Sequence, residues 1–230
     1  RISGGHAAIK LLREKRNARA RDLFLNEQRA LVRLSHPNIV PLFDLGEDFI
    51  VTAFIEGHDL GHFMRAPMSP RQAVAIAAAI GSALVAAHAQ AVLHLDVKPG
   101  NILVDGRSTP FLADFGIAWL EDDPDGARRR YRAGTTGFMA PEHAAGRPGA
   151  ASDQYSLART LLAMLTEGGM RTNTDNALRK LPHPLSDALA DPLRRALAED
   201  PGARYPSMAA FADVLRGTDV AERVGPPRRA

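Results

Sequence analysis

The feature that most constrains this chain is a polar stretch from His94 to Asn101, which Asp114-Phe115-Gly116 follows a short distance later. The first stretch places a carboxylate at Asp96, an ammonium group at Lys98 and an amide at its end. A carboxylate can accept a hydroxyl proton, a lysine can neutralise charge on oxygen atoms, and an amide with a second carboxylate can hold Mg²⁺. These residue types suit phosphoryl transfer, which depends on positioning and charge neutralisation more than on a nucleophilic side chain.

The same residues have a simpler interpretation. Each Asp or Asn, taken alone, is most often part of a polar turn in a β-hairpin. The matched positions keep a fixed spacing, and D-F-G follows after an interval typical of a β-hairpin. A chance occurrence of the whole pattern is therefore improbable. The combination resembles the catalytic loop and the metal-binding loop of the eukaryotic-type (Hanks-type) Ser/Thr protein kinases, whose usual forms are H-R-D-x-K-x-x-N and D-F-G. One position departs from this pattern, since Leu95 stands where most of the family has Arg.

The resemblance implies a fold and a domain extent. We expect an α+β, bilobal protein-kinase-like fold, with a small β-rich N-lobe that contains one long helix and a larger, mainly helical C-lobe. The domain would span residues 1–216, with the N-lobe at about 1–55 and the C-lobe at about 56–216. Residues 217–230 are expected to form a tail or linker. The abundance of Ala and Arg suggests a bacterial member of the family.

The resemblance also implies roles for individual residues. Asp96 would be the catalytic base, Lys98 would stabilise phosphate charge, and Thr135 would bond to both. Asn101 and Asp114 would bind Mg²⁺, with Mn²⁺ as an alternative ion, and the nucleotide would be ATP. The residues expected to bind the nucleotide are Ala8, Lys10, Glu27, Thr52, Ala53, Phe54, Ile55, Glu56, Leu103 and Asp114.

The glycine-rich loop that covers the phosphates in this family is missing from the sequence. No G-x-G-x-x-G motif precedes Lys10, and Ser3-Gly4-Gly5 lies too close to the lysine to replace it. The family's first strand is missing with it. Because every polar residue needed after the loop is present, we expect an active kinase whose loop lies upstream of Arg1. The alternative is a pseudokinase that acts as a scaffold and turns over little or no nucleotide.

An ion pair is expected between the first strand of the sequence and the helix that follows. Ala7 to Leu12 indicates a strand, in which Lys10 matches the lysine of the family's V-A-I-K motif. Leu23 and Leu31 recur at helical spacing and leave Glu27 on or beside the apolar face. A carboxylate that faces inward needs a counter-charge, so we expect a Lys10–Glu27 pair. The alternative is a surface pair between the glutamate and an arginine one turn away.

The remaining pattern is mainly helical after two more strands. Strands are expected at 41–45 and 49–54, joined by a polar turn. A helix should begin at the N-cap Ser69 with Pro70 in its first turn and continue to about Gln90. Further helical segments are predicted at 151–165, 193–198 and 208–215.

The segment from Gly134 to Glu142 matches the G-T-x-x-Y/F-x-A-P-E pattern, which seats a protein substrate in this family. We therefore expect a protein substrate. By the same resemblance, Asp153 would brace the backbone of the catalytic loop, and it could also cap its helix. Arg204 would pair with Glu142.

Leu95 supports an expectation about regulation. In kinases with Arg at that place, a phosphate on the activation segment pairs with it and orders the loop. Phosphorylation at Tyr131, Thr135 or Thr136 should therefore matter less here.

Composition limits the other classes of function. The net charge of +3 is modest and the basic residues are spread along the chain, so charge does not indicate nucleic acid as a partner. The Ala-rich run 73–91 contains polar residues and is expected to be a buried helix, not a membrane span. The absence of cysteine excludes disulfides and fits a cytoplasmic location. The oligomeric state cannot be inferred from the sequence.

Two further hypotheses concern other chemistry. His58 and His62 have a spacing that can bind Zn²⁺ on a helix, but no third ligand is near and Gly61 weakens the helix, so a zinc site is not expected. The second hypothesis is a small-molecule phosphotransferase of similar fold. The lysine at position 98 and the Ala140-Pro141-Glu142 segment argue against it.

Overall fold

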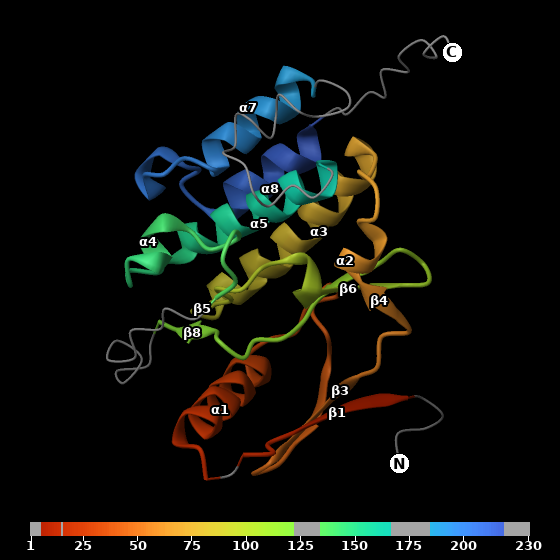
Figure 1. The fold of residues 1–230 in the computed structure, drawn as a ribbon, viewed down its shortest axis with the longest axis vertical. Helices are drawn as coiled ribbons and strands as arrows, with labels where there is room; N and C mark the ends of the chain where they lie inside the picture. Colours follow the sequence, from red (N-terminus) through yellow and green to blue (C-terminus); the bar gives the residue numbers. More distant parts are fainter. Residues whose placement is uncertain (1–5, 15, 122–133, 167–184, 219–230) are drawn as a thin grey trace.

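The computed structural model describes residues 6–14, 16–121, 134–166 and 185–218, which form an α+β fold in two parts (Figure 1). The N-terminal part consists of β1 (Ala7–Leu11), α1 (Ala18–Val32), β2 (Leu42–Leu45) and β3 (Phe49–Ala53). The second part begins with β4 (Gly57–Asp59), α2 (Leu60–Phe63), α3 (Pro70–Ala89), β5 (Val92–Leu93), η1 (Pro99–Asn101), β6 (Ile102–Asp105), β7 (Pro110–Leu112) and β8 (Trp119–Leu120). It continues with α4 (Pro141–Ala144), α5 (Ala150–Leu165), α7 (Asp187–Ala196), η3 (Pro201–Ala203) and α8 (Met208–Gly217).

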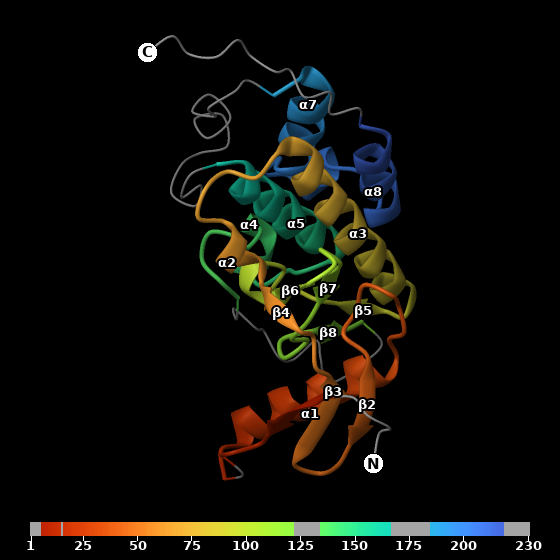
Figure 2. The ribbon, with the colours of Figure 1, turned by 90° about the vertical axis from the view of Figure 1, so that its right-hand side faces the viewer.

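The N-terminal part is an antiparallel sheet with one helix beside it, as Figure 2 shows. The strand order is β1-β3-β2, and Ala8 lies opposite Thr52 in the register of the first pair. Helix α1 begins after Asn17, whose side chain accepts from the N–H of Ala20 at 3.1 Å. The side chain of Gln28 donates to a carbonyl in the turn that joins β2 to β3, at 2.6 Å. This bond fixes α1 against the sheet, so the side chains of both can meet at one place.

The second part is built around α3. One long side of this helix packs against α5 and α8, which Figure 1 shows beside it. Ile80 and Leu84 are fully buried there, and burial of such a side chain contributes about 1.5–3 kcal/mol. A Cβ added to Gly81 would lie 3.1 Å from the Cβ of Ala212 in α8. A glycine at this position therefore lets the two helices approach closely.

Helix α3 is long and apolar enough to cross a membrane by length and composition alone. In the structure it is a core helix, because residues along its length are buried against α5, α8 and the strand β5. Its start also agrees with the sequence, since the Ser69 hydroxyl accepts from the N–H of Gln72 at 3.3 Å and Pro70 is the first helical residue.

Several short elements were not expected. β4 pairs with β6, and the two-residue strand β5 pairs with β8. Neither β4 nor β5 has a recognisable strand pattern in the sequence. The helical segment expected at 193–198 begins earlier, at Asp187, and ends at Ala196. Ser3-Gly4-Gly5, Tyr131 and nearly all of the expected tail lie outside the described residues.

Candidate active site

Three of the expected site residues meet around the carboxylate of a fourth, Asp96. Its Oδ2 accepts hydrogen bonds from Nζ of Lys98 at 2.6 Å and from Nδ2 of Asn101 at 3.0 Å. Its Oδ1 accepts from the backbone N–H of Thr135 at 3.2 Å and from the Thr135 hydroxyl at 2.9 Å. The same hydroxyl accepts from Lys98 at 2.6 Å. The residues expected to be catalytic therefore form one hydrogen-bonded cluster.

The backbone before Asp96 is held by a helix that lies far away in the sequence. Leu95 has a φ of 64° and is only 2% exposed. The left-handed region costs an ordinary residue about 1–2 kcal/mol, so this conformation needs support from its surroundings. The buried Asp153 of α5 provides it, since its carboxylate accepts from the N–H of Leu95 at 2.7 Å and from that of His94 at 2.9 Å. The expected brace is therefore present.

A third partner of Asp153 was not anticipated from the sequence. Nε2 of His88 in α3 lies 2.8 Å from Oδ2 of Asp153. Burial alone would raise the pKa of Asp153, but the hydrogen bond from His88 and the nearby His94 hold it below its ordinary value. The expected role of Asp153 as a helix cap is wrong, because α5 begins after Gly149 and its first turn is held by Ser152. The carboxylate is instead occupied by the catalytic loop.

A second cluster joins the two parts of the fold. Nζ of Lys10 in β1 donates to Oε2 of Glu27 in α1 at 2.6 Å and to Oδ1 of Asp114 at 3.1 Å. Glu27 is 5% exposed, so the alternative of a surface pair with an arginine is wrong. Burial lowers the pKa of Lys10, but the two carboxylates outweigh it and raise the pKa overall. The same lysine holds the pKa of Asp114 below its ordinary value, although burial alone would raise it.

The two clusters are joined through the backbone. The N–H of Ala113 donates to the carbonyl of Asn101 at 2.9 Å, and the carbonyl oxygen of Ala113 lies 3.1 Å from Nε2 of His94. The rings of His94 and Phe115 are in edge-to-face contact, with centroids 4.6 Å apart. Asp114, which lies between these anchored residues and has a φ of 59°, is therefore held beside the catalytic loop.

The residues expected to hold Mg²⁺ have the donor chemistry that this ion prefers. Asp114 offers a carboxylate, and the amide nitrogen of Asn101 donates to Asp96, which leaves the amide oxygen for a cation. Mg²⁺ favours such oxygen ligands and takes its remaining ones from water and phosphate. In the described residues, no group of three or more His, Asp or Glu side chains is placed to hold a metal ion. His58 and His62 stack with ring centroids 4.0 Å apart.

The residues expected to bind the nucleotide base lie along β1, β3 and the linker after it. The N–H groups of Ala53 and Phe54 already donate to the carbonyls of Pro41 at 2.9 Å and His6 at 3.5 Å. The Glu56 carboxylate lies 3.4 Å from the His6 ring, and both side chains are well exposed. Leu103 lies in β6 and is half-buried. No contact in the described residues tests whether these groups meet a nucleotide, so their role stays a prediction.

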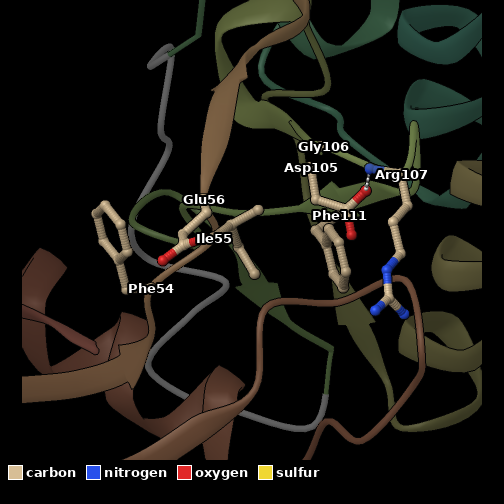
Figure 3. Close-up of a pocket in the computed structure, with 7 residues that line it drawn as sticks. All are labelled: Phe54, Ile55, Glu56, Asp105, Gly106, Arg107 and Phe111. Carbon is tan, nitrogen blue, oxygen red and sulfur yellow. Dashed lines mark hydrogen bonds between the residues drawn. The ribbon is translucent and has the colours of Figure 1, made fainter. Parts of the chain in front are cut away.

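A hollow of about 320 Å³ lies beside this linker, between Phe54-Ile55-Glu56 and the turn after β6 (Figure 3). Figure 3 shows Arg107 and Phe111 on one side of the hollow and Phe54 on the other. Neither Lys10 nor Asp114 lines it. The hollow is therefore separate from the two polar clusters.

One face of α5 holds both the catalytic loop and the segment that follows Thr135. The Ser156 hydroxyl donates to the carbonyl of Phe138 at 2.9 Å, and Nε of Arg159 donates to that of Gly137 at 2.9 Å. The Thr160 hydroxyl donates to the carbonyl of Val97 at 3.4 Å. The sequence did not reveal these roles, because an apolar helix with scattered polar residues does not show which of them face a distant loop.

The expected pair between Glu142 and Arg204 is present. Arg204 is 2% exposed, and its terminal nitrogens donate to the two carboxylate oxygens at 2.8 and 2.9 Å. Burial would raise the pKa of Glu142, but the bonds from Arg204 and Ser152 hold it below its ordinary value. The pair anchors the end of the segment that begins at Gly134.

Comparison with known proteins agrees with this geometry. Residues 1–213 match the model of the protein kinase domain family. The serine/threonine-protein kinase PkaA of Streptomyces coelicolor is 39% identical over 209 residues, which cover 86% of this chain and 38% of that protein. PkaB of the same organism is 40% identical over 179 residues, covering 70% of this chain and 43% of that protein. PknK of Mycobacterium bovis is 35% identical over 242 residues, covering 95% of this chain and 21% of that protein.

The chain thus spans less than half the length of these curated relatives, and it matches them in the part that carries the kinase motifs. Their names describe serine/threonine-protein kinases, and the family model covers nearly the whole chain. The two polar clusters, the α+β fold and these matches lead to one conclusion: the chain belongs to the protein kinase family and is homologous to bacterial Ser/Thr protein kinases.

Proposed function

We propose that this chain transfers the terminal phosphoryl group of ATP, with Mg²⁺, to Ser and Thr hydroxyls of protein substrates. The observation that carries the proposal is the contact of Thr135 with both Asp96 and Lys98. This contact ties the segment expected to seat the substrate to the carboxylate expected to receive the hydroxyl proton.

The acceptor side of the reaction would depend on Asp96. A carboxylate that is held on both oxygens keeps one orientation, so it can align a substrate hydroxyl and accept its proton. Lys98 lies 2.6 Å from this carboxylate and would neutralise charge that develops on the transferred group. The substrate hydroxyl would take a place within hydrogen-bond reach of Asp96, beside Thr135.

The donor side would depend on the second cluster. ATP bound with Mg²⁺ supplies the phosphoryl group and a cation that offsets its charge. Asn101 and Asp114 would hold the ion through their oxygen atoms, and Lys10, kept in place by the buried Glu27, would bind phosphate oxygens. Because the N–H groups of Ala53 and Phe54 are already used, the N–H of Ile55 is the donor of the linker that we assign to the adenine.

The test is phosphoryl transfer from ³²P-labelled ATP by purified Asp96→Ala and Asp114→Ala variants. Both should lose at least about 10²-fold in rate, the usual range for a lost general base or ion site. Asp213→Asn, at an exposed carboxylate in α8, is the matched control and should keep the wild-type rate. Circular dichroism spectra should show that all three variants are folded. Undiminished transfer by Asp96→Ala would contradict the proposal.

The alternative function is a pseudokinase scaffold, which would turn over little or no nucleotide. Thermal unfolding with and without Mg-ATP separates the two functions. An active kinase should be stabilised by Mg-ATP in the wild type and should lose this effect in Asp114→Ala. Stabilisation without any transfer would favour the scaffold.

A further inference from the structure

Arg159 of α5 is buried but only partly hydrogen-bonded. The residue is 7% exposed, and its Nε donates to the carbonyl of Gly137 at 2.9 Å. A guanidinium carries five N–H donors, of which this bond uses one. Within the part of the chain that the structure describes, the terminal nitrogens of Arg159 have no hydrogen-bond or ion-pair partner. No fully buried nitrogen of Arg159 lacks a partner in the described residues, so these terminal nitrogens keep some contact with solvent, where an anion can meet them.

Arg204, the other buried arginine in the described residues, has partners for its charge and its donors. Arg204 donates to both carboxylate oxygens of Glu142 and to the carbonyls of Ala151, Ala198 and Glu199. Its charge and its donors are therefore satisfied inside the fold. Arg159 is equally well placed on a rigid helix but has no carboxylate beside it in the described residues.

Arg159 lies against the segment that contacts Asp96, the carboxylate proposed to receive the substrate hydroxyl. Gly137 lies two residues after Thr135, which bonds directly to Asp96. Two residues of extended chain span at most about 7 Å. Ser156, one turn before Arg159 on α5, holds the neighbouring carbonyl of Phe138. The guanidinium is thus fixed against the segment that bonds to Asp96.

We propose that Arg159 binds an anionic side chain of the protein substrate, a carboxylate or a phosphoryl group, one or two residues from the acceptor hydroxyl. This rests on the function proposed above and adds a substrate class to it. The planar guanidinium can form two parallel bonds to such a group, which are stronger and more selective than bonds to a neutral amide. Arg159 is then a specificity-determining residue.

A phosphate on the chain itself is a second anion that Arg159 could bind. Thr136 is exposed and adjoins Gly137, so a phosphate on its hydroxyl could also reach the guanidinium. A Thr136→Val variant separates the two sources, because it removes the internal one and leaves the substrate unchanged.

The experiment uses a set of peptides with one Ser acceptor, in which Glu, Gln or Lys is placed singly at each of the four positions within two residues of the serine. At one position, kcat/KM of the wild type should be at least about 10-fold higher for Glu than for Gln. In Arg159→Gln this ratio should fall to about 1, whatever the absolute rates, and in Arg159→Lys it should be intermediate. Arg216→Gln, at an exposed arginine of α8, should keep the wild-type ratio.

Peptide binding is measured in parallel by fluorescence anisotropy, with the acceptor serine replaced by Ala, so that the test does not require turnover. Loss of all transfer with a retained, Arg159-dependent preference for the Glu peptide would contradict the proposed function and support this inference. No Glu preference in wild-type binding or transfer would overturn the inference, even if Arg159→Gln failed to fold. A preference that survives in folded Arg159→Gln, or that appears only in Thr136→Val, would overturn it as well.

Discussion

Oδ1 of Asp153 lies 2.7 Å from the backbone nitrogen of Leu95, although the two residues are 58 positions apart in the sequence. This bond joins a helix in the middle of the second part of the fold to the residue that precedes the Asp96 carboxylate. It holds a leucine in a left-handed conformation that the residue would not adopt by itself. The geometry expected for catalysis therefore depends on the packing of α5 as well as on the loop's own sequence.

The brace can be tested by Asp153→Ala. The substitution leaves two buried backbone N–H groups without an acceptor, and each such loss costs about 1–3 kcal/mol. We expect the free energy of unfolding, measured by urea denaturation, to fall by about 2–4 kcal/mol. Asp213→Ala, at an exposed carboxylate, should change it by less than about 0.5 kcal/mol. Equal stability of the two variants would show that Asp153 does not hold the loop.

The contact of Thr135 with Asp96 and Lys98 predicts a hydroxyl-dependent effect on turnover. Thr135→Val removes the hydroxyl but keeps the shape, so the catalytic carboxylate should lose its fixed orientation. We expect kcat to fall by about 10- to 100-fold, as a small displacement of a catalytic group can cause. Thr135→Ser keeps the hydroxyl and should recover most of the rate. If the valine and serine variants were equally active in steady-state assays, the hydroxyl would have no such role.

Acid should weaken the fold through Glu142, whose pKa lies below its usual value of 4.5. A carboxylate of lowered pKa contributes stability that is present above its unfolded pKa and is lost as pH falls through the folded pKa. Unfolding in urea should therefore show nearly constant stability from about pH 7 to 5 and a decline below it. Glu142→Gln should be less stable than wild type by about 2–4 kcal/mol at neutral pH, because Arg204 stays buried without its charge partner.

The decline of stability in acid should also be smaller in Glu142→Gln than in the wild type. Arg204 is the cation that faces this carboxylate, and Ser152 is its second hydrogen-bond partner. An unchanged pH dependence in the variant would assign the decline to other carboxylates, of which Asp114 and Asp153 also have lowered pKa values.

Regulation by phosphorylation should be weak. Leu95 stands where an arginine would receive an activation-segment phosphate, and it is buried with no charge to offer. Treatment of the purified protein with a phosphatase should therefore leave most of its transfer activity. The measurement compares initial rates before and after treatment, with mass spectrometry to verify the loss of phosphate. Nearly complete loss of activity would contradict this prediction.

Parts of the fold were predictable because their signals are local. Helix α3 has a capping serine, a proline in its first turn and a continuous apolar pattern, and its predicted start was confirmed. The bounds of the strands β2 and β3 were also predicted to within one residue. In contrast, β5 and β8 contain two residues each and exist only because they pair with each other. No periodic pattern can appear in so short a segment.

The same distinction holds for the candidate site. The spacing of Asp96, Lys98, Asn101 and Asp114 was enough to propose a role for each, because these groups lie close together along the chain. His88 and Arg159 could not be found in this way, since each has a partner that is distant in sequence: His88 contacts Asp153 of α5, and Arg159 contacts the carbonyl of Gly137. The sequence alone determined which polar groups are present and at what intervals. The tertiary structure decided which of them are buried together, because burial removes water and makes each unmatched donor or charge costly.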